Sequence, residues 1–273
     1  MYKKSKIYLI LIIISGFFFF QNSIFGQPRI AILYSELTNK FGSPNSGKVI
    51  DVITSWELFL MQDKIQYSVV YEDDLESGIE GEFDILILPS VEIISDAEFE
   101  KLKEFLTVGK SIICSGSKLF TKENNLNKYQ NLKSLFGINN IESVSSEKLS
   151  YIHSLIPNNL NQFSLDGELI LQISNKNQAL VVDVSEKQYS TSGYIFENNN
   201  LASKKSSIIY GMVGNGKFLW TGFDLPDVIG GNEDLIAFKN LIFNSIDWMS
   251  SEPDTYIDIL CDSLSYPVIV TLQ

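Results

Sequence analysis

Short apolar runs alternate with amphipathic stretches through the first half of the chain. An apolar run bounded by polar residues is typical of a strand that is buried on both faces of a sheet. Between these runs, apolar residues recur at spacings of three and four, which indicates helices with one buried face. Such strands are predicted at 29–34, 66–71, 83–88 and 110–114. The alternation predicts right-handed crossovers and a doubly wound, mainly parallel α/β sheet of the flavodoxin-like kind.

Two helices in this half have clear boundaries. The first is predicted over 48–61, where apolar residues repeat with helical spacing. The second is predicted to begin at Ser95, because Ser95 and Glu98 have the spacing of a capping box. It is predicted to end at Gly109, since a glycine readily takes the left-handed conformation that closes a helix.

The second half of the chain is richer in strand patterns. Gly214, Asn215 and Gly216 form a turn signal between two apolar runs, which predicts a β-hairpin. A helix is predicted over 234–249, after a short helix near 129–136. Strands are predicted at 168–173, 179–184, 193–196, 207–212, 255–261 and 266–272. We therefore expect a β-rich insertion or extension of the parallel sheet.

The first 26 residues resemble a secretory signal. Three lysines within residues 3–6 precede an apolar run at 7–20, and a short polar stretch ends at Gly26. A retained membrane anchor is the alternative, although a spanning helix needs about 20 apolar residues. We expect cleavage after Gly26 and an exported, periplasmic or extracellular protein that meets the membrane only during export. The remaining chain is predicted to hold one domain at 27–250 and, at 251–273, a linker with the start of a truncated following domain.

The charge balance and the scarce ligating residues exclude several functions. The chain has 21 basic and 33 acidic side chains, a net charge of −12; without the three signal lysines the balance is 18 to 33, or −15. Such an acidic chain repels phosphate backbones, so nucleic acid is excluded as a partner. With two cysteines, Cys114 and Cys261, and one histidine, His153, we expect no metal site and no cofactor. The cysteines could pair in an exported protein, but we expect two unpaired thiols.

Three stretches together resemble the class I glutamine amidotransferase-like superfamily. They are 83–90 with the helix that follows, 108–115, and 214–220 with the helix that ends at Trp248. Their order resembles the non-catalytic branch, which includes β-galactosidase trimerisation-type domains and domains attached to polysaccharide deacetylase-like proteins. The resemblance covers roughly 28–250. It implies the flavodoxin-like fold and a carbohydrate-related context.

The resemblance also raises the question of a catalytic thiol at Cys114. A nucleophile of this superfamily lies in a tight elbow between glycines and needs a late His and Glu, two residues apart, as its activating partners. Ile112 and Ile113 precede Cys114, so the leading glycine is missing, and His153 is followed by Ser154 and Leu155. A thiol without a base is mostly protonated at neutral pH. We therefore expect no catalytic residue.

Two places could contact a ligand. The loop 35–47 follows the first strand, at the sheet edge where open α/β sheets bind ligands, and it offers Ser43, Asn45 and Ser46. Its glycines and lysine have the spacing of a phosphate-binding loop, but Val49 stands where that motif has Ser or Thr, so we expect a flexible loop that leads into a helix. Asp224 lies near Trp220 and Phe223, a pairing that suits sugar rings or ordinary core packing.

The acidic stretch 72–82 is predicted to be a solvated loop, because it lacks the spacing of a calcium loop.

Taken together, the sequence favours an exported, non-catalytic accessory or interaction domain that is carbohydrate-associated. One alternative is the N-terminal part of a polysaccharide deacetylase-like hydrolase whose catalytic domain is missing from this chain. Another is a small-molecule or sugar-binding module. We expect a carbohydrate or protein partner and leave homo-oligomers open.

Overall fold

The computed structural model describes most of the region that the sequence assigns to a domain. The described residues are 27–42, 49–121, 130–138, 141–145, 149–154, 169–171, 178–183, 190–197, 200–225, 232–250, 257–260 and 269–272. The predicted signal, its cleavage site, the three loop residues Ser43, Asn45 and Ser46, and Cys261 lie outside them. Among the described residues, no helix is both long enough and apolar enough to span a bilayer.

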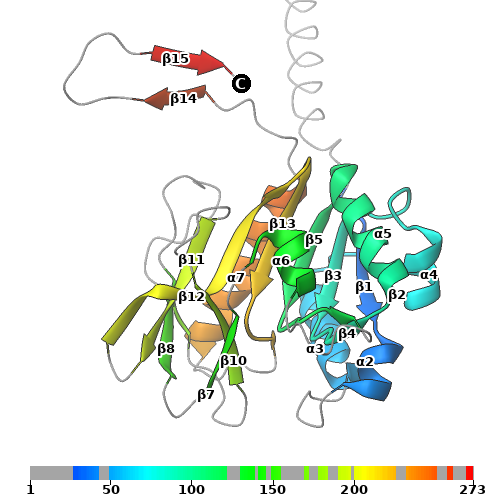
Figure 1. Ribbon diagram of the computed structural model, residues 1–273, viewed down its shortest axis with the longest axis horizontal. Coiled ribbons are helices and arrows are strands. Elements are labelled where there is room, and N and C mark those ends of the chain that lie inside the picture. The colour runs from blue at the N-terminus through cyan, green and yellow to red at the C-terminus, as the bar shows by residue number, and fades with distance from the viewer. Residues whose placement is uncertain are drawn as a thin grey trace, which may run out of the picture.

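Five parallel strands form the first half of the sheet (Figure 1). Their spatial order is β2, β1, β3, β5, β13, and each neighbouring pair is parallel. This order confirms the flavodoxin-like, doubly wound prediction, with a switch point between β1 and β3 where successive connections turn to opposite sides. The strands are β1 (Ile30–Tyr34), β2 (Tyr67–Tyr71), β3 (Ile85–Pro89), β5 (Ser111–Ser115) and β13 (Gly216–Thr221).

Antiparallel strands continue the sheet beyond β13 and confirm the predicted β-rich extension. The predicted hairpin joins β12 to β13, and the path runs on through β11 and β8 to β9, while β10 pairs with β12 and β7. A two-stranded sheet of β14 and β15 is separate from this path, as is the short pair β4 and β6. The bounds are β4 (Ile93–Ile94), β6 (Phe120–Thr121), β7 (Glu142–Ser145), β8 (Leu149–Ser154), β9 (Leu169–Leu171), β10 (Gln178–Asp183), β11 (Ser190–Glu197), β12 (Asn200–Val213), β14 (Ile257–Leu260) and β15 (Ile269–Leu272).

Helices cover both faces of the parallel strands, as a doubly wound sheet requires. Helices α3 (Val49–Gln62) and α7 (Asn232–Ser250) pack on one face, and α4 (Glu72–Ser77), α5 (Asp96–Thr107) and α6 (Gln130–Phe136) pack on the other (Figure 1). Because side chains alternate along a strand, Ile32 of β1 joins the first core and Leu33 joins the second. Both cores are therefore built from the same short apolar runs.

Two predicted loops contain helices. The polar loop after β1 begins with α2 (Glu36–Phe41), because Ser35 accepts a hydrogen bond from Thr38 N and caps the helix. The acidic stretch predicted as a solvated loop begins with α4, and that prediction was wrong for 72–77. Acidic residues are favourable at the amino end of a helix, and Asp74 also accepts a hydrogen bond from Tyr71 N. The capping box at Ser95 is confirmed at the start of α5.

Candidate functional site

Cys114 lies in the middle of the core rather than on an elbow. Its side chain is fully buried in the apolar cluster beneath α5, and burial raises the pKa of its thiol well above the ordinary value. Strand β5 stays extended through Ser115, and the left-handed backbone comes at Gly116, with φ of +60°. The left-handed residue of the turn at the carboxyl end of β5 is therefore a glycine, which carries no side chain.

His153 lies in a different part of the sheet from Cys114. It belongs to β8, where its backbone is in register with Tyr194 of β11 and Ile170 of β9. Strands β13, β12 and β11 separate β8 from β5. With strands about 4.8 Å apart, four spacings place the two backbones roughly 19 Å from each other. The backbone of the chain's one histidine is thus well separated from that of Cys114.

The predicted ligand residue Asp224 is the hub of a buried polar cluster at the carboxyl edge of the sheet. We call Trp56, Ser90, Ser115 and Asp224 the Asp224 cluster. Asp224 directly follows the turn after β13 and is 2% exposed. Its Oδ1 accepts hydrogen bonds from Trp56 Nε1 at 2.9 Å, from Ser115 Oγ at 2.5 Å, and from the backbone N of Leu225 at 2.8 Å.

The other carboxylate oxygen binds Ser90, which follows β3. Ser90 Oγ donates to Asp224 Oδ2 at 2.7 Å, and Ser90 N donates to the carbonyl of Ser115 at 2.7 Å. Ser90 has a left-handed backbone, with φ of +48°, which is uncommon for a residue other than glycine. A Cβ at Gly116 would lie 3.2 Å from Ser90 Oγ, so glycine lets the two strand ends approach. The cluster therefore joins α3 to the ends of β3, β5 and β13.

The side-chain donors of the Asp224 cluster converge on one carboxylate and hold four elements together. Both serine hydroxyls donate to the same carboxylate, and the third side-chain donor is an indole; the cluster contains neither a thiol nor an imidazole. The sequence did not point to Trp56, Ser90 or Ser115. A usable signal existed for the two serines, because each stands where a predicted parallel strand ends, and such ends meet at one edge of the sheet.

The amino edge of the sheet explains the motifs that carry the family resemblance. Asp84, just before β3, pairs with Arg29 at 3.1 Å and with Lys110 at 2.7 Å, which ties the starts of three strands together. Burial alone would raise the pKa of Asp84, but hydrogen bonds from Arg29 and Lys110 hold it well below its ordinary range. The aspartate of this motif is therefore a structural tie.

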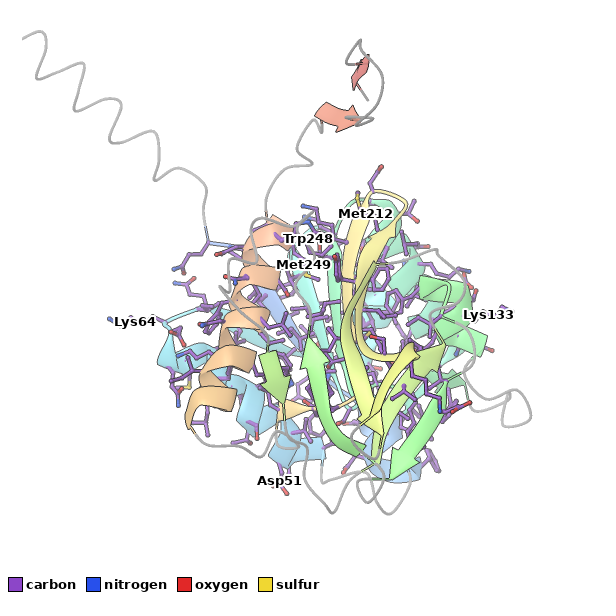
Figure 2. The ribbon with its side chains drawn as sticks, turned by 90° about the vertical axis from the view of Figure 1, so that its left-hand side faces the viewer. Asp51, Lys64, Lys133, Met212, Trp248 and Met249 are labelled. Carbon is purple, nitrogen blue, oxygen red and sulfur yellow. The ribbon has the colours of Figure 1, made fainter. Side chains whose placement is uncertain are left out.

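The glycine and lysine of the late hairpin also have structural roles. A Cβ at Gly216 would lie 2.4 Å from the carbonyl oxygen of Lys110, so only glycine fits there. The buried Lys217 donates through Nζ to the carbonyl oxygen of Trp248 at 2.5 Å, and it lies 5.4 Å from the centre of that indole ring. A cation near the last carbonyls of a helix is favourable. Figure 2 shows Trp248 near one end of α7, and Asp51, at the start of α3, near the opposite edge of the molecule.

The remaining site predictions stand as follows. Ser43, Asn45 and Ser46 lie outside the described residues, so their contact with a ligand stays a prediction. For the part of the chain that the structure describes, no group of three or more His, Cys, Asp or Glu side chains could hold a metal ion. Asp224, as noted, directs both carboxylate oxygens to internal donors.

Comparison with known proteins shows the fold. No family profile and no curated protein matches the sequence. Among solved structures, the chain is similar to the β-galactosidase from Rahnella sp. R3, with a TM-score of 0.58 at 14% identity over 83% of this chain and 33% of that one. The β-galactosidase from Bacillus circulans sp. alkalophilus matches with a TM-score of 0.59 at 12% identity over 85% of this chain and 32% of that one.

A third similar structure is of a different size. A ThuA-like protein from Bacteroides uniformis matches with a TM-score of 0.55 at 10% identity, over 84% of this chain and 93% of that one. The chain thus spans about a third of the length of the β-galactosidase chains and nearly the whole of the ThuA-like chain. At these identities the matches establish a shared α/β fold.

Proposed function

We propose that this chain is an exported, non-catalytic accessory domain of amidotransferase-like fold that acts in association with carbohydrate-active proteins. The observation that carries the proposal is the carboxyl edge of the sheet. There the elbow residue is Gly116, the nearby thiol of Cys114 is fully buried, and the polar side chains of the Asp224 cluster bind one another. A fold that keeps its framework while its reactive position lacks a side chain suits an interaction role.

The carbohydrate context rests on the comparisons. Two of the similar structures are β-galactosidases, in which a region of this fold makes up about a third of the chain. The export part rests on the basic and apolar pattern of the first 26 residues. Each part has its own test, so that the failure of one does not remove the others.

Catalysis is tested with the full chain and its Cys114→Ala variant. We expect neither protein to release ammonia from glutamine above the background of a heat-inactivated sample. The alanine variant should keep the far-ultraviolet circular dichroism spectrum of the wild type. Ammonia release by the wild type that disappears in the variant would refute the non-catalytic assignment.

Export is tested by expressing the full chain in a Gram-negative host and determining the amino terminus of the product. We expect the protein in the periplasmic fraction or the medium, beginning at Gln27. A product that retains residues 1–26 in the membrane fraction would support the anchor instead.

Association with carbohydrate is tested by a thermal-shift screen with galactose-, mannose-, glucose- and N-acetylglucosamine-containing oligosaccharides at millimolar concentration. A reproducible rise in Tm with one sugar class would support direct binding, through the relation between ligand affinity and stability. If no sugar shifts Tm, direct sugar binding is wrong, and a protein partner becomes the remaining form of the proposal. Affinity capture with purified carbohydrate-active enzymes then decides it.

A second candidate is the N-terminal part of a longer polysaccharide deacetylase-like hydrolase. The observation that favours it is the strand pair β14 and β15, whose strands pair with each other and not with the eleven-stranded sheet. A lone strand pair has little stability of its own, so it suits the beginning of another folded unit. Reading the gene beyond codon 273 tests this candidate, and a stop codon with no related reading frame downstream would remove it.

A further inference from the structure

A fully buried carboxyl group, Glu98, lies at the start of α5 with one oxygen unused. Its Oε2 accepts a 2.5 Å hydrogen bond from Ser95 N in the capping box, and the residue is 0% exposed. Its Oε1 is buried and has no hydrogen-bond partner among the residues that the structure describes. A buried charged oxygen without a donor is costly, whereas the protonated acid removes the charge from that position.

Two acids of α4 act on this position, Glu76 as a neighbour of the capping box and Glu72 through its charge. Glu76 Oε1 accepts a hydrogen bond from Ser95 Oγ at 2.6 Å, so it lies next to the capping box. Burial raises the pKa of Glu98 to about 7, the negative charges of Glu72 and Glu76 add to the shift, and hydrogen bonds from Ser95 oppose it. The three acids therefore form one electrostatic unit across the contact between α4 and α5.

Glu72 connects this unit to the carboxyl edge of the sheet. Its Oε1 accepts hydrogen bonds from Leu37 N at 2.8 Å and from Ser35 Oγ at 3.1 Å, at the start of α2. Ser35 directly follows β1, and Glu72 directly follows β2. The position of α4 thus decides whether the first turn of α2 keeps its acidic cap.

The described lysines on and around α5 are engaged or exposed elsewhere. On α5 itself, two lysines pair with glutamates three residues away, and Asp96 is exposed. The two lysines of α5 are Lys101 (with Glu104) and Lys103 (with Glu100). The lysines of the elements packed against α5 and of the turns beside them have other surroundings: Lys110 (with Asp84), Lys118 (with Glu92), Lys133 (exposed) and Lys217 (with Trp248 O).

We propose that Glu98 is the proton-dependent part of a latch between α4 and α5. While Glu98 is protonated, Glu72 and Glu76 remain beside it, and α4 stays docked against α5 and the start of α2. When Glu98 loses its proton, its buried negative charge lies beside the carboxylate of Glu76 and is repelled by the charge of Glu72, and α4 separates from α5. Because α2 and α4 follow the carboxyl ends of β1 and β2, the latch controls access to the sheet edge beside the β1–β3 switch point.

Hydrogen exchange of the backbone amides of α4 tests this latch. The full chain is measured by mass spectrometry at about pH 6 and about pH 8.5, with rates corrected for the chemical effect of pH on exchange. We expect protection of α4 to fall at least about tenfold at the higher pH, while the strands of the parallel sheet keep theirs. The Glu98→Gln variant, which has no proton to lose, should show equal protection of α4 at both pH values.

Glu100→Gln is the matched control, because it removes a carboxylate from the same helix at an exposed position. It should keep the pH dependence of the wild type. Equal pH dependence in the wild type and Glu98→Gln, or no dependence in the wild type, would overturn the proposal. If Glu98→Gln does not fold, a carbon-13 NMR titration of Glu98 in the wild type replaces it. The amide signals of α4 must then change with the same midpoint as the Glu98 carboxyl, and unchanged signals would overturn the latch.

Discussion

The two edges of the parallel sheet each have an aspartate at their centre, and the two residues are stabilised in opposite ways. At the amino edge, Asp84 has a side chain that is 35% exposed and pairs with the cations Arg29 and Lys110. At the carboxyl edge, Asp224 is 2% exposed and accepts hydrogen bonds from an indole, two hydroxyls and a backbone amide. The same side chain thus acts through charge at one edge and through directed, neutral donors at the other.

This difference has an energetic consequence. Exposed ion pairs contribute little, because water and salt screen them. Removing a buried acceptor that binds several donors costs more stability, because each donor then lacks a partner and has no access to water. We therefore expect the carboxyl edge to be the more sensitive edge for stability in this chain.

The largest effect is expected for Asp224→Ala. The change leaves Trp56 Nε1, Ser115 Oγ and Ser90 Oγ without their common acceptor, and it should lower the free energy of unfolding by at least about 3 kcal/mol. Urea denaturation at neutral pH measures it. Asp51→Ala, an exposed acid in the first turn of the helix that carries Trp56, is the control and should cost less than about 1 kcal/mol. Equal losses in the two variants would show that the Asp224 cluster is not a hub.

The second effect concerns another buried carboxyl, Glu98, whose Oε2 accepts a hydrogen bond from Ser95 N and whose Oε1 has no partner among the described residues. Its pKa is about 7 in the folded chain and 4.5 ordinarily, so the folded state holds its proton more tightly than the unfolded state. Glu98 therefore favours folding at low pH, and this contribution is lost as the pH rises from 4.5 through about 7. The total loss should be about 3 kcal/mol.

Denaturation curves of the wild type and Glu98→Gln across this pH range measure the loss as a difference. The variant should gain stability relative to the wild type as the pH rises, because glutamine does not ionise. Glu104→Gln, exposed on the same helix, should follow the wild type. A constant difference between Glu98→Gln and the wild type would mean that Glu98 does not titrate in this range.

The third effect concerns Lys217, a buried residue at the amino edge of the sheet. Lys217→Met keeps most of the side-chain volume but leaves the carbonyl of Trp248 without its donor, and it should cost about 1–2 kcal/mol. Lys133→Met, on the exposed side of α6, is the matched control and should change stability by less than about 0.5 kcal/mol. If Lys217→Met lowers the free energy of unfolding only slightly, sensitivity to mutation depends on which edge of the sheet a residue occupies rather than on whether it is buried or exposed.

The sequence predicted the parallel framework because its signals are local. Apolar runs such as 83–88, the capping box at Ser95 and the turn at Gly214 each depend on a few neighbouring residues, and each corresponds to an element of the structure. The helix α4 was missed because a run of acids is typical of solvated loops and also of the first turn of a helix. Nothing in the local pattern separates these two outcomes.

The candidate site was harder to predict because its contacts are distant in the sequence. Trp56 and Asp224 are 168 positions apart, and Ser90 and Asp224 are 134 apart. The sequence placed Asp224 near aromatic residues but identified none of its partners. The burial of Cys114 was expected from its apolar run, whereas the role of Gly116 depends on a backbone angle that only the folded chain reveals.

The smallest effect is expected for Asp84→Ala, and its value lies in how it changes with salt. Because Asp84 and its partners are partly exposed, the variant should lose about 1 kcal/mol or less at low ionic strength, and most of that loss should disappear in about 1 M salt. The loss caused by Asp224→Ala should stay the same in that salt, because its donors are neutral and buried. The pKa of Asp84 is held well below its ordinary range in the folded chain, so its contribution is present above about pH 4 and is lost as the pH falls further. Urea denaturation of both variants at low and high salt measures the contrast, and equal salt dependence at the two positions would contradict the division between a charged edge and a neutral one.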